Sequence, residues 1–459
     1  MAKVLVGGKK ASGIRSSDVW NAGLFAKTYG EEIRYCPQSG KWLIRDKSHW
    51  RNDSAERVIS LAMDLAESCY AEWRADGADA TQFSKLYRLN SARGIRAMLD
   101  LAKTRPEMVV EANELDSDPF VLATKSGLLD LRTCELAPDY DGGICTRAIP
   151  VDFDPDAKCE RWLAFIDELT CGDVELAEFI QRAVGYSLTG DTREQRFFFL
   201  YGIGCNGKST FIQLLETLLG SYAVGTPAKT LLDQRTDAIP NDLARLRGAR
   251  VVVASEIPQG SKINEARIKD LTGGDTVTAR FLHREYFDYR PNFKLWMYGN
   301  HQPQIRGGDL GIWRRVACIP CEAVISDGSR DSQLVGRLRA ELPGILNWAL
   351  VGYRQWRDGG LGSAEAVTRA SLEYRQEMDH IEQFLNIATQ RIPGSTVQAS
   401  DIYDAYKTWC KDAGRYPESQ TQFGKYLSGR DYLTKVKSRG NQFYKGICIS
   451  GQDGDSCRG

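Results

Sequence analysis

The chain has 459 residues, of which 42% are hydrophobic and 26% charged, with 60 basic and 60 acidic side chains and no net charge. A chain of this length is too long for a single hydrophobic core, which predicts several domains. Because the charges balance, any binding of nucleic acid must come from local basic patches. No signal-peptide core is visible, and the longest aliphatic run, residues 251–254, is too short to cross a bilayer. We therefore expect a cytoplasmic protein with no membrane contact.

Twelve cysteines are scattered along the chain, and without a secretion signal they are predicted to be reduced thiols. Cys318 and Cys321 have the spacing of zinc ligands, but no second pair accompanies them. Buried strand thiols are the favoured interpretation.

Residues 1–110 are expected to form an N-terminal accessory domain. Short strands or a hairpin near Gly40 are indicated at Trp42-Leu43-Ile44 and His49-Trp50, and helical periodicity follows at about 55–74 and 81–103. No metal-binding polymerase pair stands out, because Asp116-Ser117-Asp118 lacks a following histidine. Primase activity is therefore not expected in this polypeptide.

Residues 111–190 are expected to form a helical domain that precedes the core. Residues 119–123 and 126–131 first indicate strand, turn and strand, with glycine between them. A helix from about Val174 to Leu188 then closes the region, since apolar residues recur along one face.

A glycine-rich loop carries the strongest signal in the chain. Gly202 to Ser209 has two glycines separated by four residues and followed by lysine and serine, after an apolar strand (197–201) and before an amphipathic helix. Backbone N–H groups can converge on phosphate oxygens only where glycine permits so close an approach, and a lysine there neutralises the β- and γ-phosphates. The predicted nucleotide-binding residues are Gly202, Gly204, Cys205, Asn206, Gly207, Lys208, Ser209 and Thr210.

A second element is needed to tell one nucleotide-binding class from another. The buried run Val251 to Ser255 ends in Glu256, a carboxylate suited to order Mg²⁺ and polarise the attacking water, with the Ser209 hydroxyl as the other metal ligand. ATP and Mg²⁺ are therefore the expected cofactors. No guanine-reading motif is visible, which weighs against GTPases.

These elements, with those that follow, resemble superfamily 3 helicases of the phage/plasmid and poxvirus primase-helicase branch. Lys262 to Asp275 is similar to the motif between Walker B and sensor 1, Phe293 to Asn300 to sensor 1, and Gly311 to Val316 to the arginine-finger segment. The resemblance covers about 111–449. It implies an α/β fold with an AAA+-like P-loop ATPase core at 191–330, preceded by a helical N-terminal region.

The resemblance also assigns roles to polar residues beyond the loop. Asn300 would orient the lytic water, and Arg315 or Arg314 would reach the γ-phosphate of a neighbouring subunit, with Arg315 preferred by its position before the apolar strand. With Lys208 and Glu256, these are the candidate catalytic residues. An arginine acting on a neighbour requires a ring, so a homohexamer is implied.

A hairpin between Thr278 and Tyr289 is predicted to contact DNA phosphates without reading bases. His283 and Arg284 lie at the expected tip, and Lys269 and Arg280 lie nearer the nucleotide or the hairpin base. The alternative is a solvated turn.

The C-terminal residues 376–459, after a helical linker at 331–375, resemble a winged-helix DNA-binding domain. Helices are expected at 401–413 and 419–427, and a hairpin around Ser438 to Asn441 would form the wing. Basic residues dominate residues 419–447, with Asp431 as the one acid. The DNA-binding candidates are Lys425, Lys435, Lys437 and Arg439, and a protein-docking module is the alternative.

Together these observations predict an ATP-dependent helicase or translocase that acts as a ring on single-stranded or forked DNA. Its setting would be replication of a phage, plasmid or mobile element in a bacterial host, with a separate primase or initiation protein as a partner. A duplex translocase or loader that does not unwind is one alternative. A P-loop small-molecule kinase is the other, and it leaves the basic C-terminal unit unexplained.

Overall fold

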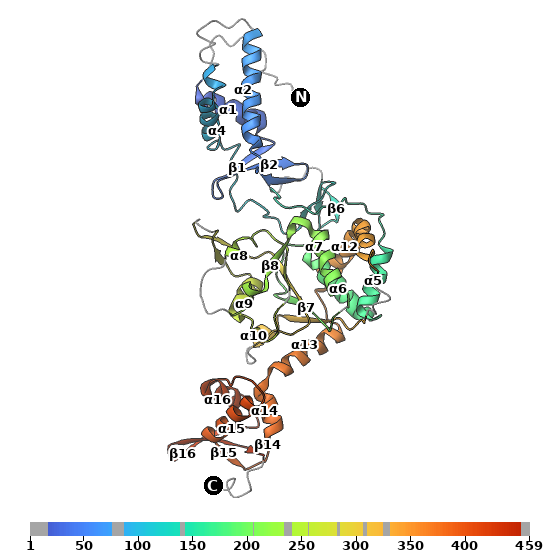
Figure 1. Cartoon of the computed structure of the whole chain (residues 1–459), viewed down its shortest axis with the longest axis vertical. Coiled ribbons are helices and arrows are strands. Elements are labelled where there is room, and N and C mark those ends of the chain that lie inside the picture. The colour runs from blue at the N-terminus through green and yellow to red at the C-terminus, as the bar shows by residue number, and fades with distance from the viewer. Residues whose placement is uncertain are drawn as a thin grey trace.

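The structure is a computed structural model and describes residues 17–75, 87–137, 143–204, 206–233, 241–255, 257–281, 285–305, 310–324 and 331–450. Figure 1 shows an N-terminal part at one end of the long axis, a central α/β body, and a C-terminal unit at the other end. Among the described helices, none combines the length and the apolar character needed to span a membrane.

The N-terminal part packs helices on a small antiparallel sheet with strand order β1-β2-β3. Its elements are α1 (Asp18–Tyr29), β1 (Ile33–Cys36), β2 (Lys41–Asp46), β3 (His49–Asn52), α2 (Arg57–Ala75) and α4 (Ala92–Ala102). The expected hairpin is confirmed, with Gly40 in the left-handed region at φ +65° between β1 and β2. The expected helix at 81–103 is wrong in its extent, since α4 begins anew at Ala92, where the Ser91 hydroxyl accepts a hydrogen bond from Gly94 N.

A second small sheet and two helices connect this part to the central body. They are β4 (Val121–Ala123), β5 (Leu128–Asp130), β6 (Glu135–Leu136), α5 (Glu160–Thr170) and α6 (Val174–Ser187). Strands β4 and β5 pair antiparallel, as the glycine-punctuated pattern predicted. The expected helix at 174–188 is confirmed by α6, whose N-cap Asp173 accepts from Leu176 N at 3.0 Å through its carboxylate.

The central sheet has five parallel strands in the order β13-β7-β12-β9-β8, which confirms the predicted parallel α/β layer. The strands are β7 (Phe197–Tyr201), β8 (Ala223–Pro227), β9 (Val251–Ser255), β12 (Lys294–Gly299) and β13 (Val316–Pro320). Alternate residues of β7 face two separate cores, Phe198 on one side and Phe199 on the other. Burial on both faces explains why these strands are continuously apolar.

Helices cover both faces of this sheet, and Figure 1 shows α6, α7 and α12 on one side and α8, α9 and α10 on the other. They are α7 (Lys208–Leu219), α8 (Asn241–Ala244), α9 (Glu265–Gly273) and α10 (Leu310–Trp313), with short 3-10 turns at η1 (Gly220–Tyr222) and η2 (Ala228–Thr230). After β7 the chain crosses to β8 at the far edge and returns through β9 and β12, and then β13 is added on the other side of β7. The strand order therefore reverses beside β7, the position where open parallel sheets bind ligands at the carboxyl ends of their strands.

Three helices follow the sheet: α11 (Leu334–Ala340), α12 (Leu342–Gly359) and α13 (Glu365–Met378). The helical linker predicted at 331–375 is first interrupted at Glu341, whose carboxylate accepts from the main-chain N–H groups of Arg161 and Trp162 at the start of α5. Within the segment expected to be a linker, α12 packs tightly on α6, because a Cβ added to Gly185 would lie 2.0 Å from Tyr353 N. This helix is thus part of the central core.

The C-terminal unit has a hydrophobic core of its own around Phe384, Tyr406 and Phe423. It contains α14 (His380–Ala388), β14 (Thr389–Gln390), β15 (Thr396–Gln398), α15 (Ala399–Asp412), α16 (Gln420–Ser428), β16 (Thr434–Ser438), β17 (Asn441–Lys445) and β18 (Cys448–Ile449). Both expected helices are present. Strands β16 and β17 form the expected hairpin, and β15 pairs with β17 on its other edge.

Candidate functional site

The glycine-rich loop (residues 202–207) leaves the carboxyl end of β7 and enters α7. A Cβ on Gly202 would lie 2.2 Å from the carbonyl oxygen of Cys321, so only glycine fits between the loop and the end of β13. Gly207 precedes α7 with φ +83°, a left-handed conformation that lets the loop turn directly into the helix. The two glycines of the predicted motif therefore each meet a steric requirement.

Lys208, the first residue of α7, is folded back across this loop and is only 5% exposed. Its Nζ donates to the Gly202 carbonyl and to Asn206 Oδ1, both at 2.7 Å, and Asn206 Nδ2 donates to the Cys321 carbonyl at 2.7 Å. Beside them, Ser209 is exposed and Thr210 is half-buried in the first turn of α7, whereas Cys205 lies outside the described residues. A buried ammonium group among backbone atoms at a helix N-terminus is suited to an anionic ligand.

Helix α5 forms the base under this loop, which the motif alone did not predict. A Cβ on Gly207 would lie 3.2 Å from Phe165, and the Trp162 ring stacks on Phe211 of α7 with centroids 5.9 Å apart. This helix was not predicted; the amphipathic pattern of residues 160–170 is typical of a helix, but the surface that it covers depends on tertiary packing.

Cys318 and Cys321 lie in and after β13 with their thiols buried. Burial raises the pKa of each thiol to about 12, so both stay protonated at neutral pH. Within the described ranges, no three His, Cys, Asp or Glu side chains are grouped as metal ligands would be.

Asn300 follows β12 at the same edge of the sheet as the loop. Gly299 pairs with Tyr201 in the parallel register, so exposed Asn300 is level with Gly202. Strand β9 ends beside β12 with Ser255 paired to Tyr298, and the next residue, Glu256, lies outside the described residues. The structure thus brings Asn300 to the nucleotide-binding candidates.

Arg314 and Arg315 lie at the opposite edge, just before β13. The Arg315 carbonyl accepts from Phe197 N at 2.8 Å, so both arginines are level with the start of β7, about 16 Å of strand away from the loop. Arg315 is 8% exposed, and its guanidinium donates to Thr272 Oγ1 at 3.1 Å and to the Gly311 carbonyl at 2.6 Å. Arg314 is exposed and donates to Gln195 Oε1 at 2.7 Å.

The predicted hairpin is present as β10 (Val277–Ala279) and β11 (Phe287–Tyr289), paired antiparallel after α9. Arg280 is exposed, with its guanidinium 4.8 Å from the centre of the Tyr286 ring. Lys269 is half-buried on α9. The expected tip residues, His283 and Arg284, lie outside the described residues.

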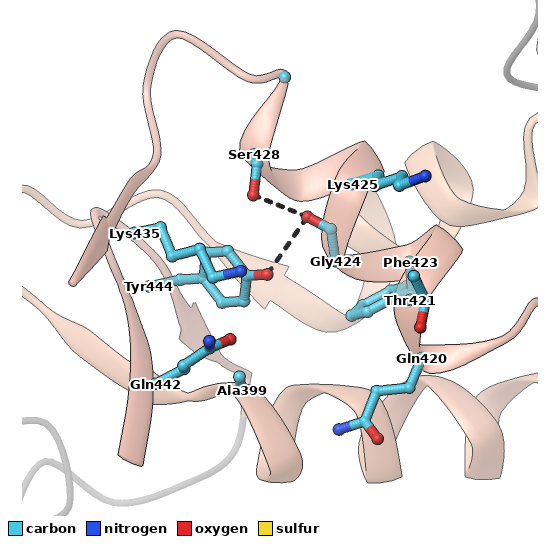
Figure 2. A pocket seen from close by; sticks show the side chains of 11 residues that line it. Ala399, Gln420, Thr421, Phe423, Gly424, Lys425, Ser428, Lys435, Gln442 and Tyr444 are labelled. Carbon is cyan, nitrogen blue, oxygen red and sulfur yellow. Dashed lines mark hydrogen bonds between the residues drawn. The ribbon is translucent and has the colours of Figure 1, made fainter. Parts of the chain in front are cut away.

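In the C-terminal unit, a groove of about 620 Å³ separates α16 from the β16–β17 hairpin. Figure 2 shows Lys425 on the helix and Lys435 on the strand at its two walls, with Tyr444 between them. No carboxylate is among the residues that line it, and Lys437 and Arg439 are exposed along the hairpin. Arg430, part of the basic run, is instead paired with Glu382 at 2.6 Å.

Comparison with known proteins adds two family matches. Residues 22–171 match the D5 N-terminal-like family, and residues 200–315 match a family of unknown function (DUF5906). The first match begins within α1, so the similarity reaches into the N-terminal part, whose role the sequence had not indicated.

Similar curated proteins come from large DNA viruses. A protein of Acanthamoeba polyphaga mimivirus named as a helicase is 26% identical over 335 residues, covering 67% of this chain and 35% of that protein. The Primase D5 of fowlpox virus is 25% identical over 228 residues, covering 46% of this chain and 28% of that protein. The chain thus spans about a third or less of the length of these relatives.

The solved apo structure of the NrS-1 C-terminal region shares the fold, with a TM-score of 0.52 at 11% identity, over 94% of this chain and 99% of that one. The match of residues 22–171 to the D5 N-terminal-like family and the viral relatives support a D5-like primase-helicase. This finding confirms the family that the ordered sequence motifs indicated.

Proposed function

We propose that the protein is an ATP-hydrolysing helicase or translocase that acts on single-stranded DNA during replication of a viral or mobile-element genome. The observation that carries this proposal is the buried Lys208 folded over the glycine-rich loop, at the point where the order of parallel strands reverses. Helicase and primase names among the relatives agree with it.

The residues at the loop fit a magnesium-bound nucleoside triphosphate. Gly202 and Gly207 let the loop pack closely on Cys321 and Phe165 and turn into α7, α7 presents its N-terminus, and Lys208 supplies a positive charge for the β- and γ-phosphates. Ser209 and Glu256 would hold Mg²⁺, which neutralises developing charge on the phosphates when it is bound. Asn300, level with Gly202, would orient water by a neutral hydrogen bond.

The placement of the arginines supports a ring. Because Arg314 and Arg315 lie at the opposite edge from the loop of their own chain, they would act on the loop of a neighbouring subunit, as in a hexamer. Arg314 is the better candidate for this role, since it is exposed, whereas the buried Arg315 is bound to Thr272 and Gly311. This reverses the preference drawn from sequence position.

Two surfaces are proposed to contact DNA. The β10–β11 hairpin presents exposed Arg280 directly after β10, and the C-terminal unit, with helices and a hairpin as expected for a winged helix, presents Lys425, Lys435, Lys437 and Arg439. Such side chains bind phosphates without reading sequence. A motor that moves along one strand needs this kind of contact.

The test measures ATP hydrolysis with and without single-stranded DNA, and strand displacement from a forked duplex. The unaltered chain should hydrolyse ATP faster with DNA and displace a strand, and Lys208→Met should lose both activities. Stimulation by DNA without displacement would instead identify a duplex translocase or loader. Hydrolysis that ignores DNA, by a protein that remains monomeric with ATP, would favour the small-molecule kinase.

A further inference from the structure

Both arginines before β13 are linked to the end of α9, Arg315 directly and Arg314 through Gln195. Arg315 Nε donates to Thr272 Oγ1 at 3.1 Å. Arg314 Nη2 donates to Gln195 Oε1 at 2.7 Å, and Gln195 Nε2 donates in turn to the Gly273 carbonyl at 3.4 Å. Gln195 is thus the single described side chain that bridges Arg314 to this helix end.

The end of α9 is also the root of the β10–β11 hairpin. The helix ends at Gly273, its cap Gly274 has φ +80°, and β10 begins at Val277. Within the hairpin, Thr278 Oγ1 donates to Asp288 Oδ1 at 2.6 Å across the two strands. A displacement of the Gly273 carbonyl would therefore be passed to a paired ribbon rather than absorbed by a long loop.

Gln195 has an unusual backbone conformation. Its φ of +54° is in the left-handed region, which non-glycine residues seldom adopt and which recurs at functional sites. The short bond from the Arg314 guanidinium is charge-assisted, whereas the 3.4 Å bond to Gly273 is at the weak end of the range. The two ends of one amide thus hold a strong and a weak partner.

We propose that Gln195 is a positioning residue that couples Arg314 to the DNA-contacting hairpin. This inference rests on the proposed function, in which Arg314 acts on the phosphates of a neighbouring subunit. To do so, Arg314 must exchange its bond with Gln195 for one to phosphate, and the amide is then free to change its contact with Gly273. The same link in reverse makes hydrolysis sensitive to DNA at the hairpin, since coupling between two binding sites is reciprocal.

Two substitutions of Gln195 separate the halves of this link. Gln195→Met keeps the length of the side chain and removes both hydrogen bonds. Gln195→Glu keeps an acceptor for Arg314, now as an ion pair, and replaces the donor to Gly273 with an oxygen. Arg193→Ala is the matched control, because this exposed residue of the same loop pairs with Asp191 at 2.5 Å and lies over the Trp356 ring, away from both arginines.

The experiment uses the full chain and measures ATP turnover with and without single-stranded DNA, and DNA affinity with and without a non-hydrolysable ATP analogue. In Gln195→Met the stimulation of ATP turnover by DNA should fall by about fivefold or more, and the ATP analogue should no longer change the affinity for DNA. The KM for ATP should stay within about twofold of the parent value. Gln195→Glu should also lower kcat without DNA, because Arg314 is held more tightly. Arg193→Ala should behave as the parent does.

Stimulation by DNA in Gln195→Met that equals that of the parent would overturn the coupling role and leave the proposed function standing. A parent that hydrolyses no ATP, or ignores DNA, would overturn both proposals. A drop in stimulation that Arg193→Ala reproduces would assign the effect to the loop and not to the Gln195 amide.

Discussion

The central body and the C-terminal unit both carry cations, but three of those in the central body are buried, whereas the lysines of the C-terminal hairpin are exposed. Lys208, Lys294 and Arg315 are between 1% and 8% exposed, and each is bound to main-chain oxygens. Lys435 and Lys437 are exposed on a hairpin edge. The buried cations hold main-chain atoms in place, whereas the exposed lysines add positive charge to a surface that other cations also make positive. The same substitution should therefore cost more at a buried cation than at an exposed one.

Substitution of the two arginines before β13 should give the largest effects. Exposed Arg314 is proposed to act in hydrolysis, whereas buried Arg315 stabilises the fold. Arg314→Ala is expected to slow ATP hydrolysis by about 10³-fold or more, the effect of removing an arginine finger, with little change in urea stability. Arg315→Ala should lower the free energy of unfolding by about 1–3 kcal/mol, because buried Thr272 and half-buried Gly311 lose a donor. Turnover and urea denaturation of both variants would measure this, and equal losses in both assays would contradict the division.

Next in size is the effect of a single methyl group at the loop. Gly202→Ala places a Cβ 2.2 Å from the Cys321 carbonyl, so the loop must move away from β13, and hydrolysis should fall about 10²-fold or more. Gly336→Ala is the control, since a Cβ on this residue of α11 meets nothing within 4 Å and should be neutral or slightly stabilising. Near-parental hydrolysis by Gly202→Ala would show that the loop does not need this close approach.

Local patterns predicted those parts of the fold whose chemistry is contained in neighbouring residues. The strand and helix around the glycine-rich loop, helix α6 and the β16–β17 hairpin all follow from periodicity and turn residues in one window of sequence. Helix α1 and strand β8 were not predicted, because neither has a clear apolar period, and tertiary packing decides their conformation.

For the candidate site, too, the sequence predicted what depends on neighbouring residues and missed what depends on tertiary packing. Asn300 was singled out by its place after an apolar strand, and the parallel register sets it level with the loop. Other contacts join residues that are distant in sequence. Arg315 bonds to Thr272, 43 positions away, and Arg314 bonds to Gln195, 119 positions away. The pairing of Arg430 with Glu382 is likewise a contact between distant residues. A count of charges cannot show which cations remain free to meet a ligand.

A buried lysine should make stability depend on pH in a way that exposed lysines do not. Burial lowers the pKa of Lys294 well below 10.5, and its Nζ donates to the Thr189 and Asp191 carbonyls. Between its lowered pKa and 10.5 the unfolded chain binds more protons than the folded one, so stability from this group rises with pH by up to about 1.4 kcal/mol per unit. The difference in unfolding free energy between parent and Lys294→Met should therefore shift in favour of the parent as pH rises toward 10, and a constant difference would contradict it.

The smallest effects are expected on the exposed hairpin of the C-terminal unit, where each lysine would contribute one of several phosphate contacts. Lys437→Gln should weaken binding of DNA by a few-fold at low salt, reduce the slope of log affinity against log salt by about one, and leave ATP hydrolysis without DNA unchanged. Lys407→Gln is the matched control, because this lysine of α15 is already paired with Asp404 at 2.6 Å. If the control and Lys437→Gln change the salt slope alike, the unit binds through its overall charge rather than through the groove edge. If neither changes it, a protein-docking role for the unit is favoured, since an exposed positive edge that releases no counterions is not in contact with phosphates.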